Sequence, residues 1–162
     1  MMYKRILVPL EHSPYDAAII EHVRKLAAFC EASVVLIHDA ARPLVGDDTI
    51  ERVVGTVRGG QNAIAALPVV DTLKEVDDGG RIVKTIERER LWRAQTPQGF
   101  TRETIVRAHR EALAQKLSAT DDAALCERLG IPVVVVRGSE RAMKITEEPD
   151  FARAEALFMI PE

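Results

Sequence analysis

YKRILVPLEHSPYDAAIIEHVRKLAAFCEASVVLIH, residues 3–38, is the stretch of sequence that decides the fold. The compact apolar run ILV at 6–8 is typical of a strand that is covered on both faces. A helical pattern follows, in which Ser13 is expected to cap the helix and Pro14 suits its first turn. A second apolar run, VVLI at 34–37, completes a strand–helix–strand unit, whose crossover is almost always right-handed.

The rest of the chain continues to alternate strands with helices. Helical spacing of apolar residues at 50–57 ends at Gly59-Gly60, and short apolar segments at 63–70, 91–96 and 132–136 are predicted strands. Thr101, Thr120 and Thr146 each precede a helical pattern and are predicted caps. We therefore predict one α/β domain over residues 1–162, a three-layer sandwich with a mostly parallel, Rossmann-like sheet.

Residues 72–86 are predicted to form a hairpin that projects from this domain. Asp77-Asp78-Gly79-Gly80 has the composition of a hairpin turn, and the flanking residues offer little apolar surface. An isolated two-stranded hairpin is marginally stable in water, so a projecting one usually leans on a partner. We predict an arm at about 71–90 through which the protein forms a homodimer.

Composition narrows the classes of partner. The chain has 162 residues, 47% of them hydrophobic and 29% charged, with a net charge of -3. The sequence has no run of basic residues, so charge adds little to any attraction for nucleic acid. No apolar stretch approaches the roughly 20 residues that a membrane span requires. Lys4 and Arg5 lead directly into a strand and not into a signal peptide. We expect a cytoplasmic protein with no nucleic-acid or membrane partner and with Cys30 and Cys126 as buried thiols.

Residues 3–38 resemble the opening of universal stress proteins: a strand, an acidic-x-Ser turn, a helix, and a strand that ends in Leu-x-His. The resemblance implies a small nucleotide-binding stress protein, whose ATP phosphates rest on a later Gly-x2-Gly-x9-Gly-Ser/Thr loop. That glycine spacing does not occur in this sequence. An ATP site of the stress-protein type is therefore not expected.

From His38 onward the resemblance changes family. Five motifs occur in the order found in 2-C-methyl-D-erythritol 4-phosphate cytidylyltransferases, enzymes of non-mevalonate isoprenoid biosynthesis. They are HDAARP (38–43), ALPVVDTLK (66–74), LWRAQTPQGF (91–100), TDDAAL (120–125) and GSERAMKIT (138–146). The resemblance covers residues 39–162 and implies a nucleotidyltransferase that acts on CTP and methylerythritol phosphate.

The same resemblance implies roles for particular residues. Asp39 matches an aspartate that helps to hold Mg²⁺ and the reacting phosphates, and Lys144 matches a lysine near the transferring phosphate. Asp39 could instead be a simple turn-former at a strand end. Asp121 and Asp122 occupy a helix N-terminus, where carboxylates are favoured without any metal. The resemblance implies substrate contacts for four further residues, namely Arg42, Thr72, Arg88 and Thr96.

The nucleotide half of such a site is missing from its expected place. The family follows its first strand with an Ala-Ala-Gly-x-Gly-x-Arg type loop, whose amides cradle the triphosphate. This chain has Leu10-Glu11-His12-Ser13 there, without glycine and with an added carboxylate. We therefore predict very weak or absent activity, leave the nucleotide-binding residues unknown, and interpret the chain as a chimera with its junction near residue 38. The alternatives are an engineered or recombined fold without enzymatic function and a stress-type nucleotide-binding protein.

Overall fold

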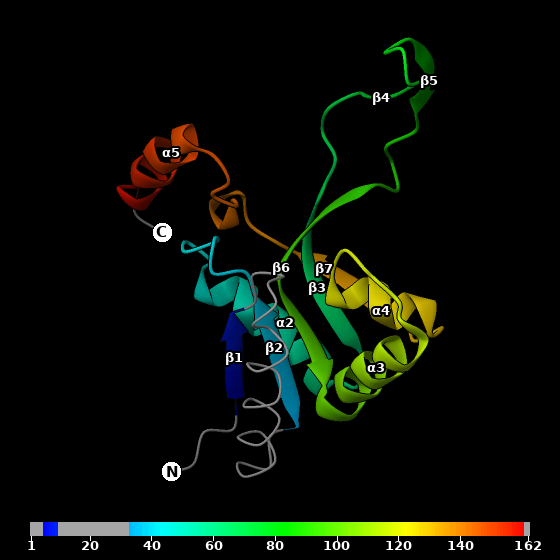
Figure 1. The fold of residues 1–162 in the computed structure, drawn as a ribbon. Helices are drawn as coiled ribbons and strands as arrows, with labels where there is room; N and C mark the ends of the chain where they lie inside the picture. The colour runs from blue at the N-terminus through cyan, green and yellow to red at the C-terminus, as the bar shows by residue number, and fades with distance from the viewer. Residues whose placement is uncertain (1–4, 10–32, 161–162) are drawn as a thin grey trace.

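The computed structural model describes residues 5–9 and 33–160 (Figure 1). The helix predicted after Ser13, the Leu10–Ser13 turn and Cys30 lie outside the described residues. The centre of the molecule is a five-stranded sheet. Its strand order is β1 (Arg5–Pro9), β2 (Val34–His38), β6 (Trp92–Thr101), β3 (Asn62–Pro68) and β7 (Val133–Arg137).

The sheet is mixed. β1 pairs with β2 in parallel and β3 pairs with β7 in parallel, whereas β6 lies antiparallel between β2 and β3. Of the described strands in this sheet, β6 alone therefore runs against the other four. The predicted α/β class is confirmed, but the sheet has an antiparallel strand at its centre. The chain leaves the sheet at the end of β3, forms the hairpin, and returns as β6, so β6 runs in the opposite direction beside β3.

Helices cover both faces of the sheet and give the three predicted layers. α2 (Asp47–Arg58) packs on one face, and α3 (Arg102–Gln115) and α4 (Asp122–Arg128) pack on the other. Side chains alternate along β2, so that Val34 and Leu36 join the core under α2 while Val35 and Ile37 join the core under α3 and α4. Each face thus has its own hydrophobic core.

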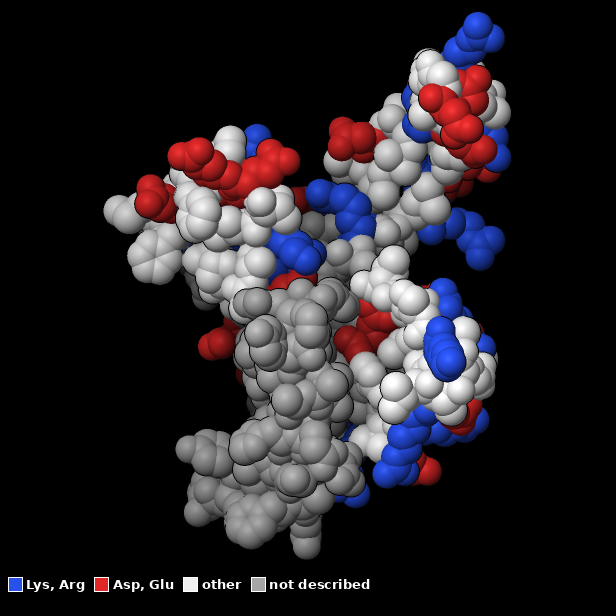
Figure 2. Space-filling model, viewed as in Figure 1, with Lys and Arg blue, Asp and Glu red and all other residues white. Residues whose placement is uncertain are grey.

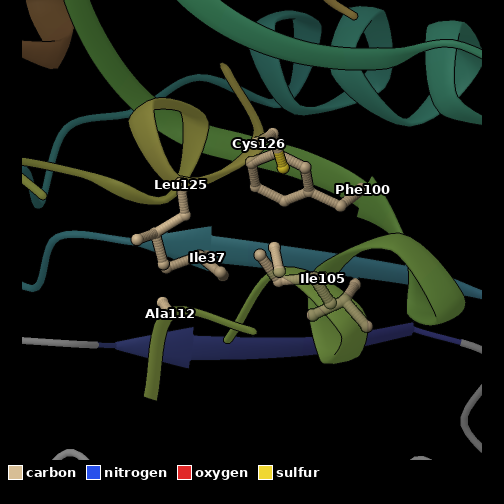
Figure 3. Close-up of a cluster of buried hydrophobic side chains, with 8 residues drawn as sticks. Ile37, Phe100, Ile105, Ala112, Leu125 and Cys126 are labelled. Carbon is tan, nitrogen blue, oxygen red and sulfur yellow. The ribbon is translucent and has the colours of Figure 1, made fainter. Parts of the chain in front are cut away.

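Two adjacent residues of β6 face the two cores, one with a large side chain and one with none. Phe100 is completely buried in the core under α3 and α4, beside Ile105 and Cys126 (Figure 3). Gly99 faces α2, where an added Cβ would lie 2.5 Å from Val53 Cγ1. The strand therefore presents a large ring to one layer and bare backbone to the other, which allows α2 to approach closely.

Cys126 is a buried thiol, as the sequence predicts. Its side chain is fully buried, and this burial raises the pKa of the thiol to about 11. The thiol is therefore protonated at neutral pH and acts as a small apolar group in the core.

The helix caps are confirmed in one case and corrected in two. Thr101 caps α3 as predicted, because its side chain accepts a hydrogen bond from the backbone of Thr104. The residue after Thr120, Asp121, caps α4. At α5 (Glu148–Phe158), the cap position belongs to Glu147. In both corrected cases an acidic residue next to the predicted threonine takes the position, since a carboxylate is also favoured by the helix dipole.

The projecting hairpin is also confirmed. β4 (Leu73–Val76) and β5 (Ile82–Ile86) form a separate two-stranded sheet that extends away from the domain (Figure 1). Asp77 closes the turn, since one of its carboxylate oxygens accepts hydrogen bonds from the backbone of Gly79 and Arg81. The hairpin and its base expose five apolar side chains, namely Val70, Leu73, Val76, Ile82 and Val83.

α5 lies apart from the sheet at the other side of the arm's base (Figure 1). Within this helix Ala154 is buried, while Phe151 and Phe158 are exposed. Among the described helices, none has the length and apolar character that a membrane crossing requires.

Candidate functional site

A polar pocket lies where β2 ends, beside the first half of β6 and the loop that follows β7. Because β6 is antiparallel, its beginning meets the carboxyl ends of its neighbours, the edge at which open α/β sheets bind ligands. Figure 2 shows basic side chains gathered between α5 and the arm, and acidic side chains inside the hollow below them. The polar lining consists of Asp39, Arg42, Gln95, Thr96, Gln98, Thr120, Asp121, Asp122 and Lys144.

Three of the residues named by the sequence meet at one carboxylate. Asp39 Oδ2 lies 3.2 Å from Arg42 Nε and 3.3 Å from Lys144 Nζ. The side chains of Asp39 and Arg42 are largely buried, whereas that of Lys144 is 43% exposed. These three groups together carry one net positive charge, which suits an anion such as a phosphate, while Asp121 and Asp122 add two negative charges to the lining of the same pocket.

Backbone contacts hold these side chains in place. A tight turn follows β2, in which the Arg42 amide donates to the Asp39 carbonyl at 3.0 Å. Arg42 Nη1 then donates to the Ala142 carbonyl at 2.7 Å, and the Ile145 amide donates to the Ala41 carbonyl at 2.8 Å. The turn after β2 is therefore fastened to the segment that carries Lys144.

Thr96 lies in the same site and supports the Asp39 turn. Its Oγ1 accepts a hydrogen bond from the Asp39 amide at 2.9 Å and lies 2.8 Å from His38 Nδ1. His38 Nε2 lies 3.1 Å from the Arg42 carbonyl, which can only accept, so Nε2 carries the ring proton. Burial lowers the pKa of His38, which favours the neutral ring at neutral pH, and in the Nε2-protonated tautomer Nδ1 can accept from the Thr96 hydroxyl.

The sequence interpretation assigned no role to His38, although a histidine at the end of a fully buried strand was a usable signal. Gln95 and Gln98 were likewise not singled out, and both are buried in the wall of the pocket. Buried polar side chains need hydrogen-bond partners. Gln95 finds its partners in the loop after β7, and Gln98 finds its partners at the start of α4.

Thr72 and Arg88 do not join the pocket within one chain. Both belong to the exposed arm region, and Arg88 Nη1 donates to the carbonyl of Val70 at the arm's base. The structure thus brings together Asp39, Arg42, Thr96 and Lys144, and leaves Thr72 and Arg88 on the projecting hairpin.

The acidic groups of the pocket differ in their availability to a metal. Asp121 accepts from Gln98 Nε2 at 2.9 Å and caps α4, and Asp122 lies 2.6 Å from His109 Nε2. Both aspartates thus act at the helix start, and the described residues contain no cluster of three or more metal-ligating side chains. Mg²⁺ often uses one or two carboxylates with phosphates and water, so Asp39 fits such an ion only together with phosphate oxygens.

Comparison with known proteins identifies the family. The sequence profile of 2-C-methyl-D-erythritol 4-phosphate cytidylyltransferase matches residues 20–159, and so begins within residues 3–38, which the sequence interpretation had assigned to a stress-protein segment. The enzyme of that name from Synechococcus elongatus is 46% identical over 126 residues, which are 78% of this chain and 54% of that protein. The one from Syntrophus aciditrophicus is 47% identical over 123 residues, 76% of this chain and 53% of that protein.

The fold comparison agrees with the sequence comparison. The crystal structure of 2-C-methyl-D-erythritol 4-phosphate cytidylyltransferase from Thermus thermophilus superposes with a TM-score of 0.79 at 36% identity, covering 93% of this chain and 72% of that one. This chain spans about half the length of the curated relatives that it matches. On its profile match, its sequence identity and its fold, the chain belongs to the 2-C-methyl-D-erythritol 4-phosphate cytidylyltransferase family.

Proposed function

We propose that the pocket binds methylerythritol phosphate and supports cytidylyl transfer from CTP, with pyrophosphate as the leaving group. The observation that carries this proposal is the placement of Asp39 between Arg42 and Lys144 at the carboxyl edge of the sheet. Such transfers depend chiefly on positioning and on neutralising charge, because the protein itself forms no covalent bond. Two cations around one carboxylate can both position the phosphates and neutralise their charge.

Each residue of the cluster has a distinct task in this proposal. Lys144, the more exposed cation, neutralises charge on the transferring phosphate. Arg42, with its fixed planar guanidinium, orients the substrate phosphate. Asp39 would hold Mg²⁺, which when bound supplies positive charge to the phosphate oxygens. Thr96 keeps the Asp39 turn in position through the Asp39 amide.

The arm suggests that a second copy completes the site. Thr72 and Arg88 lie away from the pocket of their own chain, on a hairpin whose apolar side chains are uncovered. We infer that two copies pair through their arms, and that each arm brings Thr72 and Arg88 toward the pocket of the other copy.

The dimer can be tested by sedimentation. The wild-type protein is expected to sediment as a dimer, and Ile82→Lys with Val83→Lys as a monomer, because these exposed arm residues would then place charge in an apolar interface. Leu113→Lys on α3 is a matched control, since Leu113 is even more exposed and should leave the dimer intact. A monomeric wild type would remove the proposed role of the arm.

Turnover is expected to be very weak. The turn that follows the first strand contains Glu11, whose charge opposes a triphosphate. That turn lies outside the described residues, so this part of the proposal rests on sequence. The competing proposals are an engineered or recombined fold that only folds and dimerises, and a stress-type nucleotide-binding protein, which residues 3–38 alone suggest. The profile match from residue 20 favours cytidylyltransferase ancestry for the second part of that segment.

The experiment separates substrate binding from turnover. Calorimetry with methylerythritol phosphate and Mg²⁺ is expected to show binding that Arg42→Ala weakens by about tenfold, since a charge-assisted hydrogen bond to the substrate phosphate is lost. Arg102→Ala, at the exposed start of α3, is the matched control. With CTP added, pyrophosphate release should stay near background.

Other outcomes would discriminate the alternatives. Absence of methylerythritol phosphate binding would contradict the proposed substrate site, whereas turnover typical of the family would contradict only the predicted weakness. Thermal melts with ATP and with CTP test nucleotide binding, because a ligand that binds only the folded state raises the transition temperature. A rise with ATP alone would favour the stress-type protein.

A further inference from the structure

The segment that carries Lys144 has no regular structure of its own to fix it. It follows β7 through the 3-10 helix η1 (Glu140–Ala142), and residues 143–146 belong to no helix or strand. An ammonium group on such a segment stays near Asp39 only if other parts of the fold hold the backbone. The fastening of Ile145 to Ala41 acts on one side, and a second fastening lies on the other.

Gln95 provides this second fastening. It lies on β6 where the register with β3 is irregular, and its side chain is only 7% exposed. Its Oε1 accepts from the Ser139 amide at 3.1 Å. Its Nε2 donates to the carbonyls of Ser139 at 2.9 Å and Ala142 at 3.3 Å. One carboxamide thus binds both ends of η1, and both of its Nε2 hydrogens have acceptors.

Gly138 makes room for this carboxamide. A Cβ added at Gly138 would collide with Gln95 Oε1 and would lie 3.3 Å from the backbone nitrogen of Ala66. The Gly138 amide itself donates to the Ala66 carbonyl at 2.8 Å. The glycine is therefore required by close approach, since any side chain would displace the Gln95 amide.

The fastening extends to the charged cluster through one shared acceptor. The Ala142 carbonyl accepts hydrogen bonds from Gln95 Nε2 and from Arg42 Nη1. The Nε atom of the same arginine contacts the Asp39 carboxylate. We propose that Gln95, seated against Gly138, is a positioning residue that holds the Lys144 segment over Asp39. This inference deepens the proposed function, because it concerns the same site, but its test needs no substrate.

The first test measures the accessibility of the Lys144 amine with acetic anhydride, followed by peptide mass spectrometry, with exposed Lys116 as the internal reference. Gln95→Met keeps the volume and removes the hydrogen bonds. It is expected to raise the Lys144 to Lys116 labelling ratio about threefold, the scale of a partly exposed ion pair. Asp39→Asn, which removes the pair directly, should raise the ratio similarly. Gln61→Met at an exposed glutamine should leave it unchanged.

A second variant guards against a folding failure of Gln95→Met. Gly138→Ala keeps the carboxamide and displaces it, so it should raise the same ratio. Its effect on the melting temperature should also depend on Gln95: a clear decrease in the wild-type background, and a smaller decrease in a Gln95→Ala background, where the carboxamide is gone and only the close approach to the Ala66 backbone remains. An unchanged labelling ratio in the folded variants, or equal melting effects in both backgrounds, would overturn the inference. Because neither readout uses methylerythritol phosphate or CTP, failure of the proposed function would leave this test intact.

Discussion

Phe100→Ala is expected to lower the free energy of unfolding by about 3–5 kcal/mol, the range for deleting a buried aromatic ring. Phe100 is fully buried between β2 and the two helices of its layer, and the cavity left by the ring would be lined by side chains such as Ile105 and Cys126. Domains of this size have a total stability of about 5–15 kcal/mol, so the loss is a large fraction of it. Urea denaturation with an unchanged slope measures the effect.

Phe151→Ala is the matched control for this prediction. Phe151 lies on α5 with 60% of its surface exposed, so the same substitution should change the free energy of unfolding by no more than about 0.5 kcal/mol. A loss below about 1 kcal/mol for Phe100→Ala, or similar losses for the two variants, would contradict the packing described for β6.

Gly99→Ala is expected to cost about 1–3 kcal/mol through overpacking. The new methyl group would lie 2.5 Å from Val53 Cγ1 and 2.9 Å from Val57 Cγ2. Valine on a helix has one strongly preferred rotamer, so these side chains cannot turn aside, and α2 must move away from the sheet. Thermal or urea unfolding measures this loss.

The control for Gly99→Ala is the same substitution in α2. A methyl group added at Gly55 would have nothing within 4 Å, so Gly55→Ala should raise the free energy of unfolding by about 0.5–1 kcal/mol. Both substitutions restrict the unfolded chain equally, which leaves the packing of the folded state as the difference between them. Equal effects of the two variants would show that α2 does not pack closely on Gly99.

Local patterns in the sequence predicted the elements better than their arrangement. The apolar run before His38, the Thr101 cap and the turn at Asp77 all appear in the structure, because each depends on residues close together in the chain. The direction of β6 was not predictable in this way. Nothing in residues 92–101 encodes an antiparallel strand, since that direction results from the return of the chain through the arm.

The site shows the same division. The family motifs named Asp39, Arg42, Thr96 and Lys144, and the fold brings them together. The motifs could not indicate Gln95 as a fastening, because its partners lie on a distant loop and the contact requires a glycine opposite. Thr72 and Arg88 lie exposed in the arm region, away from the pocket of their own chain, so their assignment stays a prediction.

The pairing of Thr96 with His38 limits what a ligand can offer at this position. With His38 in the Nε2-protonated tautomer, Thr96 Oγ1 donates its hydrogen to His38 Nδ1, and one of its two lone pairs accepts from the Asp39 amide. Thr96 Oγ1 then has one lone pair left, so it can accept a hydrogen bond from an incoming molecule but cannot donate one. An unprotonated phosphate oxygen can only accept, so it cannot form a hydrogen bond with this hydroxyl. If the pocket binds a phosphorylated polyol as proposed, Thr96 would therefore favour contact with an alcohol group of that molecule over contact with its phosphoryl end.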